Sequence, residues 1–125
     1  MSGHLMAQSS DAYPSKPVRI IVPVSAGGST DRLARLLAEK LSVTWKQPVI
    51  VENLTGAGGS IGATQAAKSK PDGYTLLLHS DAVVLNLALL SKPNYSLSDL
   101  TGVVKVAANP QILVVRPGLG VSTLK

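Results

Sequence analysis

Two copies of the tetrapeptide Ala-Gly-Gly-Ser, at residues 26–29 and 57–60, are the part of this chain best suited to bind a ligand. Each copy follows a run of β-branched apolar residues and precedes a stretch with helical spacing. A glycine-rich turn that opens a helix leaves backbone N–H groups unpaired, and the helix dipole adds partial positive charge there. Two such turns at one sheet edge predict a site for a small acidic molecule.

The first loop also carries hydroxyl side chains, which favour a carboxylate or a hydroxyl-bearing ligand. Its candidate binding residues are Ser25, Ala26, Gly27, Gly28, Ser29 and Thr30. The alternative is a tight turn in which the glycines are only a steric necessity. Asp31 has two candidate roles, stabilising the first helical turn or accepting a donor from the ligand, and the first is favoured. Ser29 or Thr30 is the predicted N-cap of this helix.

The second loop adds Gly58, Gly59 and Ser60 to the candidates and invites a nucleotide-binding interpretation. After Gly56 and Gly58, a dinucleotide fingerprint needs glycine or alanine at the position of Ile61. The Gly-Lys-Ser/Thr of a phosphate-binding P-loop is absent from the sequence. A nucleotide- or phosphate-binding domain of a small oxidoreductase or transferase is therefore kept only as the alternative function.

His79, Ser80 and Asp81 have the residue types of a catalytic triad but are consecutive, so their side chains point in different directions. We therefore predict no catalytic residues, no metal site and no cofactor. At the carboxyl end of a predicted strand, these three residues are candidates to line a pocket. Glu52 and Asn53 end another strand and have the same two interpretations, pocket lining or a solvated loop edge.

The composition indicates a globular chain of 125 residues with net charge +5 and no cysteine. Its Lys and Arg residues are scattered singly, which argues against nucleic acid and favours acidic ligands. The longest apolar run, 82–90, is too short to span a membrane. Residues 1–12 lack the apolar stretch of a signal peptide, and we interpret them as an expression scar followed by a flexible N-terminus.

Apolar runs that suit strands alternate with helical spacing along the chain. Strands are expected at 18–24, 48–53 and 74–78, and helices after each Ala-Gly-Gly-Ser loop and at 82–90. Trp45 is expected just past the first helix, packed on the sheet. Two further β-rich runs lie at 101–107 and 111–115, and 121–125 is expected to begin another helix. This alternation predicts an α/β fold, a three-layer lobe with a mostly parallel sheet and ligands at its carboxyl edge.

Several of these motifs, taken in order, resemble one family. Residues 13–23 and 26–35 closely resemble the opening of the Bug/TctC proteins, the extracytoplasmic solute-binding components of tripartite tricarboxylate transporters. The resemblance continues through 47–53, 56–63 and 71–78 and covers the chain from Tyr13 to Lys125. At position 24 this chain has valine where the family usually has an aromatic residue.

The resemblance implies a two-lobed, periplasmic-binding-protein type II-like clamshell that traps a small carboxylate and delivers it to membrane transporter subunits. It implies a periplasmic binding protein, not an enzyme. By resemblance, the first loop from Ser25 to Asp31 holds the carboxylate, and neighbouring loops add further contacts. The resemblance also implies that 13–125 is a truncated N-terminal lobe without the second lobe. A lone lobe exposes half a cleft and an incomplete sheet edge, which favours a homodimer or a pure oligomerisation module.

Overall fold

The computed structural model describes residues 13–110, 112–120 and 123. Strands and helices alternate along it, as predicted, and two single turns of 3-10 helix, Ala57–Gly59 and Leu97–Asp99, complete the elements. In chain order the strands and α-helices are β1 Val18–Val22, α1 Ser29–Trp45, β2 Val49–Asn53, α2 Ser60–Ala67, β3 Thr75–Leu77 and α3 Ala82–Leu89. Two expectations lie outside the described residues. One concerns residues 1–12, and the other is the start of a helix at 121–125, of which the structure describes residue 123 alone.

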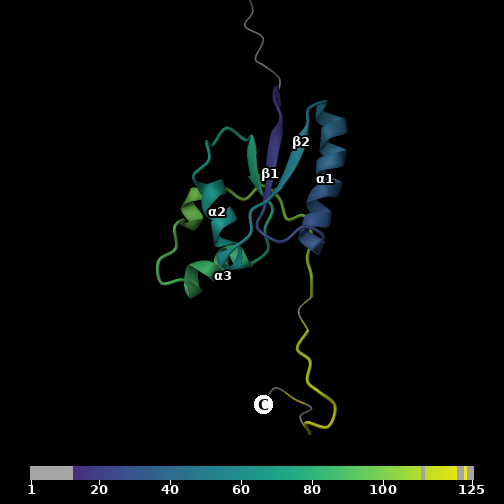
Figure 1. Cartoon of the computed structure of the whole chain (residues 1–125), viewed down its shortest axis with the longest axis vertical. Coiled ribbons are helices and arrows are strands. Elements are labelled where there is room, and N and C mark those ends of the chain that lie inside the picture. The colour runs from purple at the N-terminus through teal and green to yellow at the C-terminus, as the bar shows by residue number, and fades with distance from the viewer. Residues whose placement is uncertain (1–12, 111, 121–122, 124–125) are drawn as a thin grey trace, which may run out of the picture.

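The three strands form one parallel sheet in the order β2-β1-β3. Val18 of β1 pairs with Val49 of β2, and Ile20 pairs with Leu76 of β3. Helix α1 packs against β1 and β2, whereas α2 packs against β1 and β3 on the other face (Figure 1). The predicted three-layer α/β lobe is therefore confirmed.

The core lies between the central strand and α1. Ile20 and Val22 point from β1 toward Ala34 and Ala38 of α1, and all four are buried. The two alanines are small enough for the helix to approach the strand closely, and aliphatic side chains from β2 and β3 pack around them. Strand β1 is buried along almost its whole length because helices cover both of its faces.

Aromatic side chains gather at the amino edge of the sheet, opposite the predicted ligand edge. The Tyr13 ring meets those of Trp45 and Tyr74 edge-on, at centroid distances of 6.0 and 5.2 Å. The Tyr13 hydroxyl also donates to the Gly73 carbonyl oxygen at 2.7 Å. Trp45 is the last residue of α1 and meets Tyr13 edge-on, so the expectation that it lies just past the helix was wrong by one residue.

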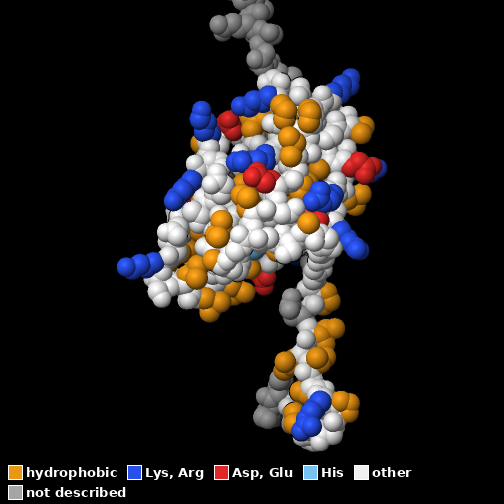
Figure 2. Space-filling model, in the orientation of Figure 1, with side chains coloured by type: hydrophobic (Ala, Val, Ile, Leu, Met, Phe, Trp, Pro, Cys, Tyr) orange, Lys and Arg blue, Asp and Glu red, His pale blue; other side chains and the backbone are white. Residues whose placement is uncertain are grey.

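The strands expected at 101–107 and 111–115 are absent from the described residues of those runs, and Gln111 lies outside them. Val103 and Ile112 are 83% and 79% exposed, and the later part of this stretch extends away from the body of the molecule (Figure 2). Residues with high strand propensity form a strand where they pair with a neighbouring strand and bury one face. The described residues of this segment do neither. The local pattern of β-branched residues is therefore not enough to form these strands.

Helix α3 exposes apolar side chains as well. Val84, Leu85 and Leu89 are at least half exposed, whereas the polar Asn86 is buried. None of the helices in the described part of the chain is both long enough and apolar enough to span a lipid bilayer. The exposed face of α3 and the segment after residue 100 are thus two apolar surfaces of the structure.

We expect the chain to self-associate through the segment 101–115, because exposed β-branched residues pair readily with open strand edges such as those of β2 and β3. Light scattering across a concentration series should show a mass that rises above that of a monomer. The double substitution Val103→Lys and Leu113→Lys should return the mass to that of a monomer. Val43→Lys, on an equally exposed valine of α1, should not. A monomer mass for the unmodified chain at every concentration would refute this expectation.

Candidate anion-binding site at the carboxyl edge of the sheet

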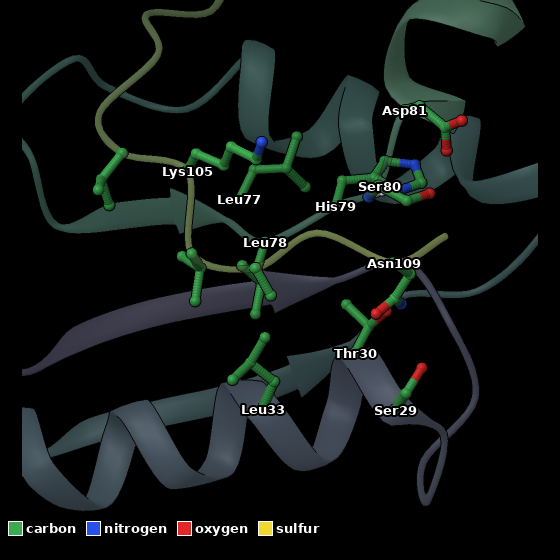
Figure 3. A pocket seen from close by; sticks show the side chains of 13 residues that line it. Ser29, Thr30, Leu33, Leu77, Leu78, His79, Ser80, Asp81, Lys105 and Asn109 are labelled. Atoms are coloured by element: carbon green, nitrogen blue, oxygen red, sulfur yellow. Dashed lines mark hydrogen bonds between the residues drawn. The ribbon is translucent and has the colours of Figure 1, made fainter. Parts of the chain in front are cut away.

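A cavity of about 630 Å³ lies at the carboxyl edge of the sheet. The first turn of α1 forms one side, the end of β3 and the loop after it form the other, and residues 104–109 run between them (Figure 3). Its lining residues are Ser29, Thr30, Leu33, Leu77, Leu78, His79, Ser80, Asp81, Val104, Lys105, Val106, Ala107 and Asn109. Apolar side chains thus form the walls, and polar groups come mainly from two loop ends.

The structure brings five of the predicted site residues to this cavity. They are Ser29, Thr30, His79, Ser80 and Asp81. The other members of the first loop, Ser25, Ala26, Gly27 and Gly28, are exposed and immediately precede α1 without lining the cavity. Gly58, Gly59 and Ser60 do not line it either. The two Ala-Gly-Gly-Ser loops therefore do not contribute equally.

The start of α1 is suited to an anion. Gly28, not Ser29 or Thr30, is the N-cap, and it makes no side-chain capping hydrogen bond. The prediction of a hydroxyl cap was therefore wrong, because the helix begins one residue earlier and both hydroxyls fall in its first turn. The first N–H groups of an α-helix have no partner within the helix. In a helix of 17 residues, they and the dipole favour a negative charge beside Ser29 and Thr30.

Asp31 is almost fully buried, and its carboxylate accepts three hydrogen bonds from the protein. Oδ2 accepts from Gly27 N at 2.8 Å and from Arg35 Nε at 3.0 Å. Oδ1 accepts from Asn53 Nδ2 at 2.9 Å. The hydrogen bond from Arg35 and then those from Gly27 and Asn53 hold the pKa of Asp31 far below its ordinary value. Asp31 is therefore ionised at neutral pH, and the positive charge of Arg35 balances its negative charge.

The second loop lies behind the cavity. Gly58 and Gly59 have left-handed φ values of 63° and 95°, within the turn that opens α2. Asn86 of α3 donates from Nδ2 to the Gly58 carbonyl oxygen at 2.9 Å. A Cβ built on Gly59 would lie 2.6 Å from Nε2 of His79. The glycines of this loop thus permit close packing of α2, α3 and His79, a steric role that had been considered only for the first loop.

His79 connects this second loop to the cavity. Its Nδ1 accepts a hydrogen bond from Ser80 N at 2.9 Å, so the neutral ring carries its proton on Nε2. Nε2 is buried and has no hydrogen-bond partner in the described part of the chain. Burial lowers the pKa of His79 below its ordinary value of 6.5, against a smaller opposing effect of Asp81. The imidazole is therefore neutral at pH 7.

Nine residues of the site and its surroundings were not predicted to act there. They are Arg35, which bonds to Asp31, and the lining residues Leu33, Leu77, Leu78, Val104, Lys105, Val106, Ala107 and Asn109. The spacing of Asp31 and Arg35, four residues apart on one helix face, is a signal that would have indicated their ion pair. Asn53, for which pocket lining was one interpretation, instead bonds to Asp31 and to the Val24 carbonyl oxygen. No local pattern marks Lys105, because it lies in a run expected to form a strand.

Comparison with known proteins defines the family of this α/β chain. The model of the tripartite tricarboxylate transporter family receptor, TctC, matches residues 33–125, and the chain belongs to that family. Protein BugT of Bordetella pertussis is 45% identical over 119 residues, which are 93% of this chain and 36% of BugT. The chain thus spans about a third of the length of the curated relatives it matches.

Solved structures agree with this family and with the fold. The periplasmic binding protein BugD is 54% identical, with a TM-score of 0.50 over 52% of this chain and 22% of BugD. MatC from Rhodopseudomonas palustris, solved with bound malate, is 43% identical with a TM-score of 0.50 over the same shares. A second R. palustris protein, solved with adipate, is 42% identical with a TM-score of 0.51, also over 52% and 22%.

Proposed function

We propose that this chain forms the carboxylate-capturing lobe of a periplasmic solute-binding receptor that serves a tripartite transporter and catalyses no reaction. The observation that carries the proposal is the N-terminus of α1, which has no side-chain cap and opens into a cavity beside Ser29 and Thr30. Backbone N–H groups, two hydroxyls and the helix dipole are donors for a carboxylate. In the whole receptor, closure of a second lobe would bury the ligand.

Among the other charges around the cavity, the cation of Lys105 supports an anionic ligand, whereas the carboxylate of Asp81 opposes one. Lys105 lines the cavity and adds a cation, and Arg35 neutralises the buried carboxylate of Asp31. Asp81 also lines the cavity, next to the neutral His79 and to Ser80. We place direct ligand contacts at the first turn of α1 and at His79 and Ser80. Ser25 to Gly28 complete the first loop, whereas Gly59 lies against His79 and the second loop makes no direct ligand contact.

The solved relatives support this ligand class. MatC is solved with malate, and a second R. palustris protein with adipate, and both ligands are dicarboxylates. BugD is described as a periplasmic binding protein, which supports the same compartment for this receptor. Membership of a transporter receptor family supports delivery to membrane subunits. The nucleotide-binding alternative has no comparable support, because its glycine pattern breaks at Ile61.

A titration followed by ¹⁵N–¹H NMR tests the proposal. Malate and adipate should shift the amide signals of residues 25–31 and 79–80, because these are the proposed contacts at the first turn of α1, His79 and Ser80, together with the loop that leads into that turn. NAD and ATP are the controls, and they should leave these signals unchanged. Shifts with the nucleotides alone would favour the alternative function. No shift with any carboxylate at millimolar concentration would contradict binding by this lobe.

A further inference from the structure

We infer that Asp31 is a positioning residue, which acts with Asn53 and Arg35 to fix the backbone of the loop at residues 24–28 and does not itself contact the ligand. The part of this inference that concerns ligand affinity rests on the proposed function. The part that concerns the shape of the loop does not, and the two are tested separately below.

The three side chains form a closed ring of hydrogen bonds. Arg35 donates from Nε to Asp31 Oδ2 and from a terminal nitrogen to Asn53 Oδ1, each at 3.0 Å. Asn53 donates from Nδ2 to Asp31 Oδ1 at 2.9 Å and closes the ring. Two of these residues lie on successive turns of α1, and the third is the last residue of β2. The ring therefore ties the start of α1 to the sheet.

Two further hydrogen bonds connect this ring to the loop backbone. Gly27 donates its N–H to Asp31 Oδ2 at 2.8 Å, and Asn53 Nδ2 donates to the Val24 carbonyl oxygen at 3.0 Å. Gly27 has a left-handed φ of 89°, and no atom outside its chain neighbours lies within 4 Å of a Cβ built there. Its conformation is thus held by this N–H contact and not by packing.

The electrostatics exclude Asp31 as a contact of an anion. A bare carboxylate at this position would repel a ligand carboxylate at the helix N-terminus. Here the side chain is 2% exposed, both oxygens are occupied by protein donors, and the Arg35 guanidinium balances its charge. Asp31 can therefore fix the loop beside the anion site without repelling the anion.

The first test requires no substitution. In the unmodified chain, a scalar coupling across the hydrogen bond should connect the Gly27 amide nitrogen with the side-chain carboxyl carbon of Asp31. The Gly27 amide should also exchange with solvent far more slowly than that of its exposed neighbour Ala26. Absence of the coupling together with rapid exchange at Gly27 would overturn the inference, whatever the chain binds.

The second test is a double-mutant cycle on the full chain with Asp31→Asn and Asn53→Ala, measured with malate well below the unfolding temperature. Each substitution should shift the amides of residues 24–28 and weaken malate binding about tenfold, and the double variant should be no weaker than either. Glu52→Gln is the control, because it removes the neighbouring carboxylate, which pairs with Arg19 at 3.1 Å. It should change neither the loop signals nor the affinity by more than about twofold.

The remaining outcomes separate the two parts of the inference. If malate shifts the Asp31 carboxyl signal and only Asp31→Asn weakens binding, Asp31 is a ligand contact and the inference is wrong. Unchanged loop signals in both variants would also overturn it. If the unmodified chain binds no malate, the proposed function fails, and changed loop signals in both variants still support the positioning role.

Discussion

Substituting Gly62 by alanine should destabilise the fold by about 2 kcal/mol, although alanine is the better helix former. Gly62 is buried in α2, where a Cβ would lie 2.9 Å from the Leu54 carbonyl oxygen and 3.0 Å from two ring carbons of Pro23. The first of these neighbours is backbone and the second is a rigid ring at the end of β1. Neither can move aside without displacing the sheet, so α2 must shift.

Thermal unfolding would measure this effect, and the midpoint should fall by about 10 °C for a domain of this size. Gly102→Ala is the matched control, because nothing lies within 4 Å of a Cβ built there. It should change the stability by less than about 0.5 kcal/mol. Equal midpoints for both variants would mean that α2 packs less closely on the carboxyl edge than this geometry requires.

The strands and helices between residues 18 and 90 illustrate what the sequence predicts well, and the contact between α2 and β1 illustrates what it does not. Alternating β-branched runs and helical spacing are local signals, and they predicted every strand and helix between residues 18 and 90 to within a few positions. The parallel sheet followed from that alternation. The close approach at Gly62 did not follow, because it depends on which face of α2 meets Pro23 and Leu54. Such contacts are set by tertiary packing.

The position of the candidate site was also predictable from local signals, whereas its detailed contacts were not. Both loops were placed at the carboxyl ends of strands, which is where the cavity lies. The unequal roles of the loops were not predictable, because the two tetrapeptides are identical. Their difference comes from the helices they open, of 17 and eight residues, and from the distant Asn86, which bonds to the second loop.

The ring around Asp31 shows a further limit of local patterns. The spacing of Asp31 and Arg35 is visible in the sequence, but Asn53 reaches them only because it pairs with Val22 in the parallel register of β1 and β2. For the segment after residue 100, the local pattern predicted structure that did not form. Its strand pattern is strong, yet the described residues offer it no paired neighbour.

Gly59→Ala is expected to have the second large effect and to act through His79. A residue with a side chain is strained at the φ of 95° found here, at a cost of about 1 kcal/mol. In addition, the new Cβ would lie 2.6 Å from Nε2 and 2.8 Å from Cε1 of His79. The imidazole must leave its buried position, and we expect a total loss of about 2 kcal/mol.

Gly27→Ala separates strain from the collision, because Gly27 has a similar φ of 89° and open space around a built Cβ. Gly27→Ala should lose only the stability that the backbone strain costs, about 1 kcal/mol.

The direction in which the pKa of His79 changes supplies an independent measurement. Burial lowers the pKa of His79 below 6.5, so expulsion of the ring into solvent in Gly59→Ala should raise the pKa toward that value. An NMR titration of the assigned His79 ring signal would show this rise in Gly59→Ala and none in Gly27→Ala. An unchanged pKa in both variants would mean that Gly59 does not hold His79 in its buried place at the cavity wall.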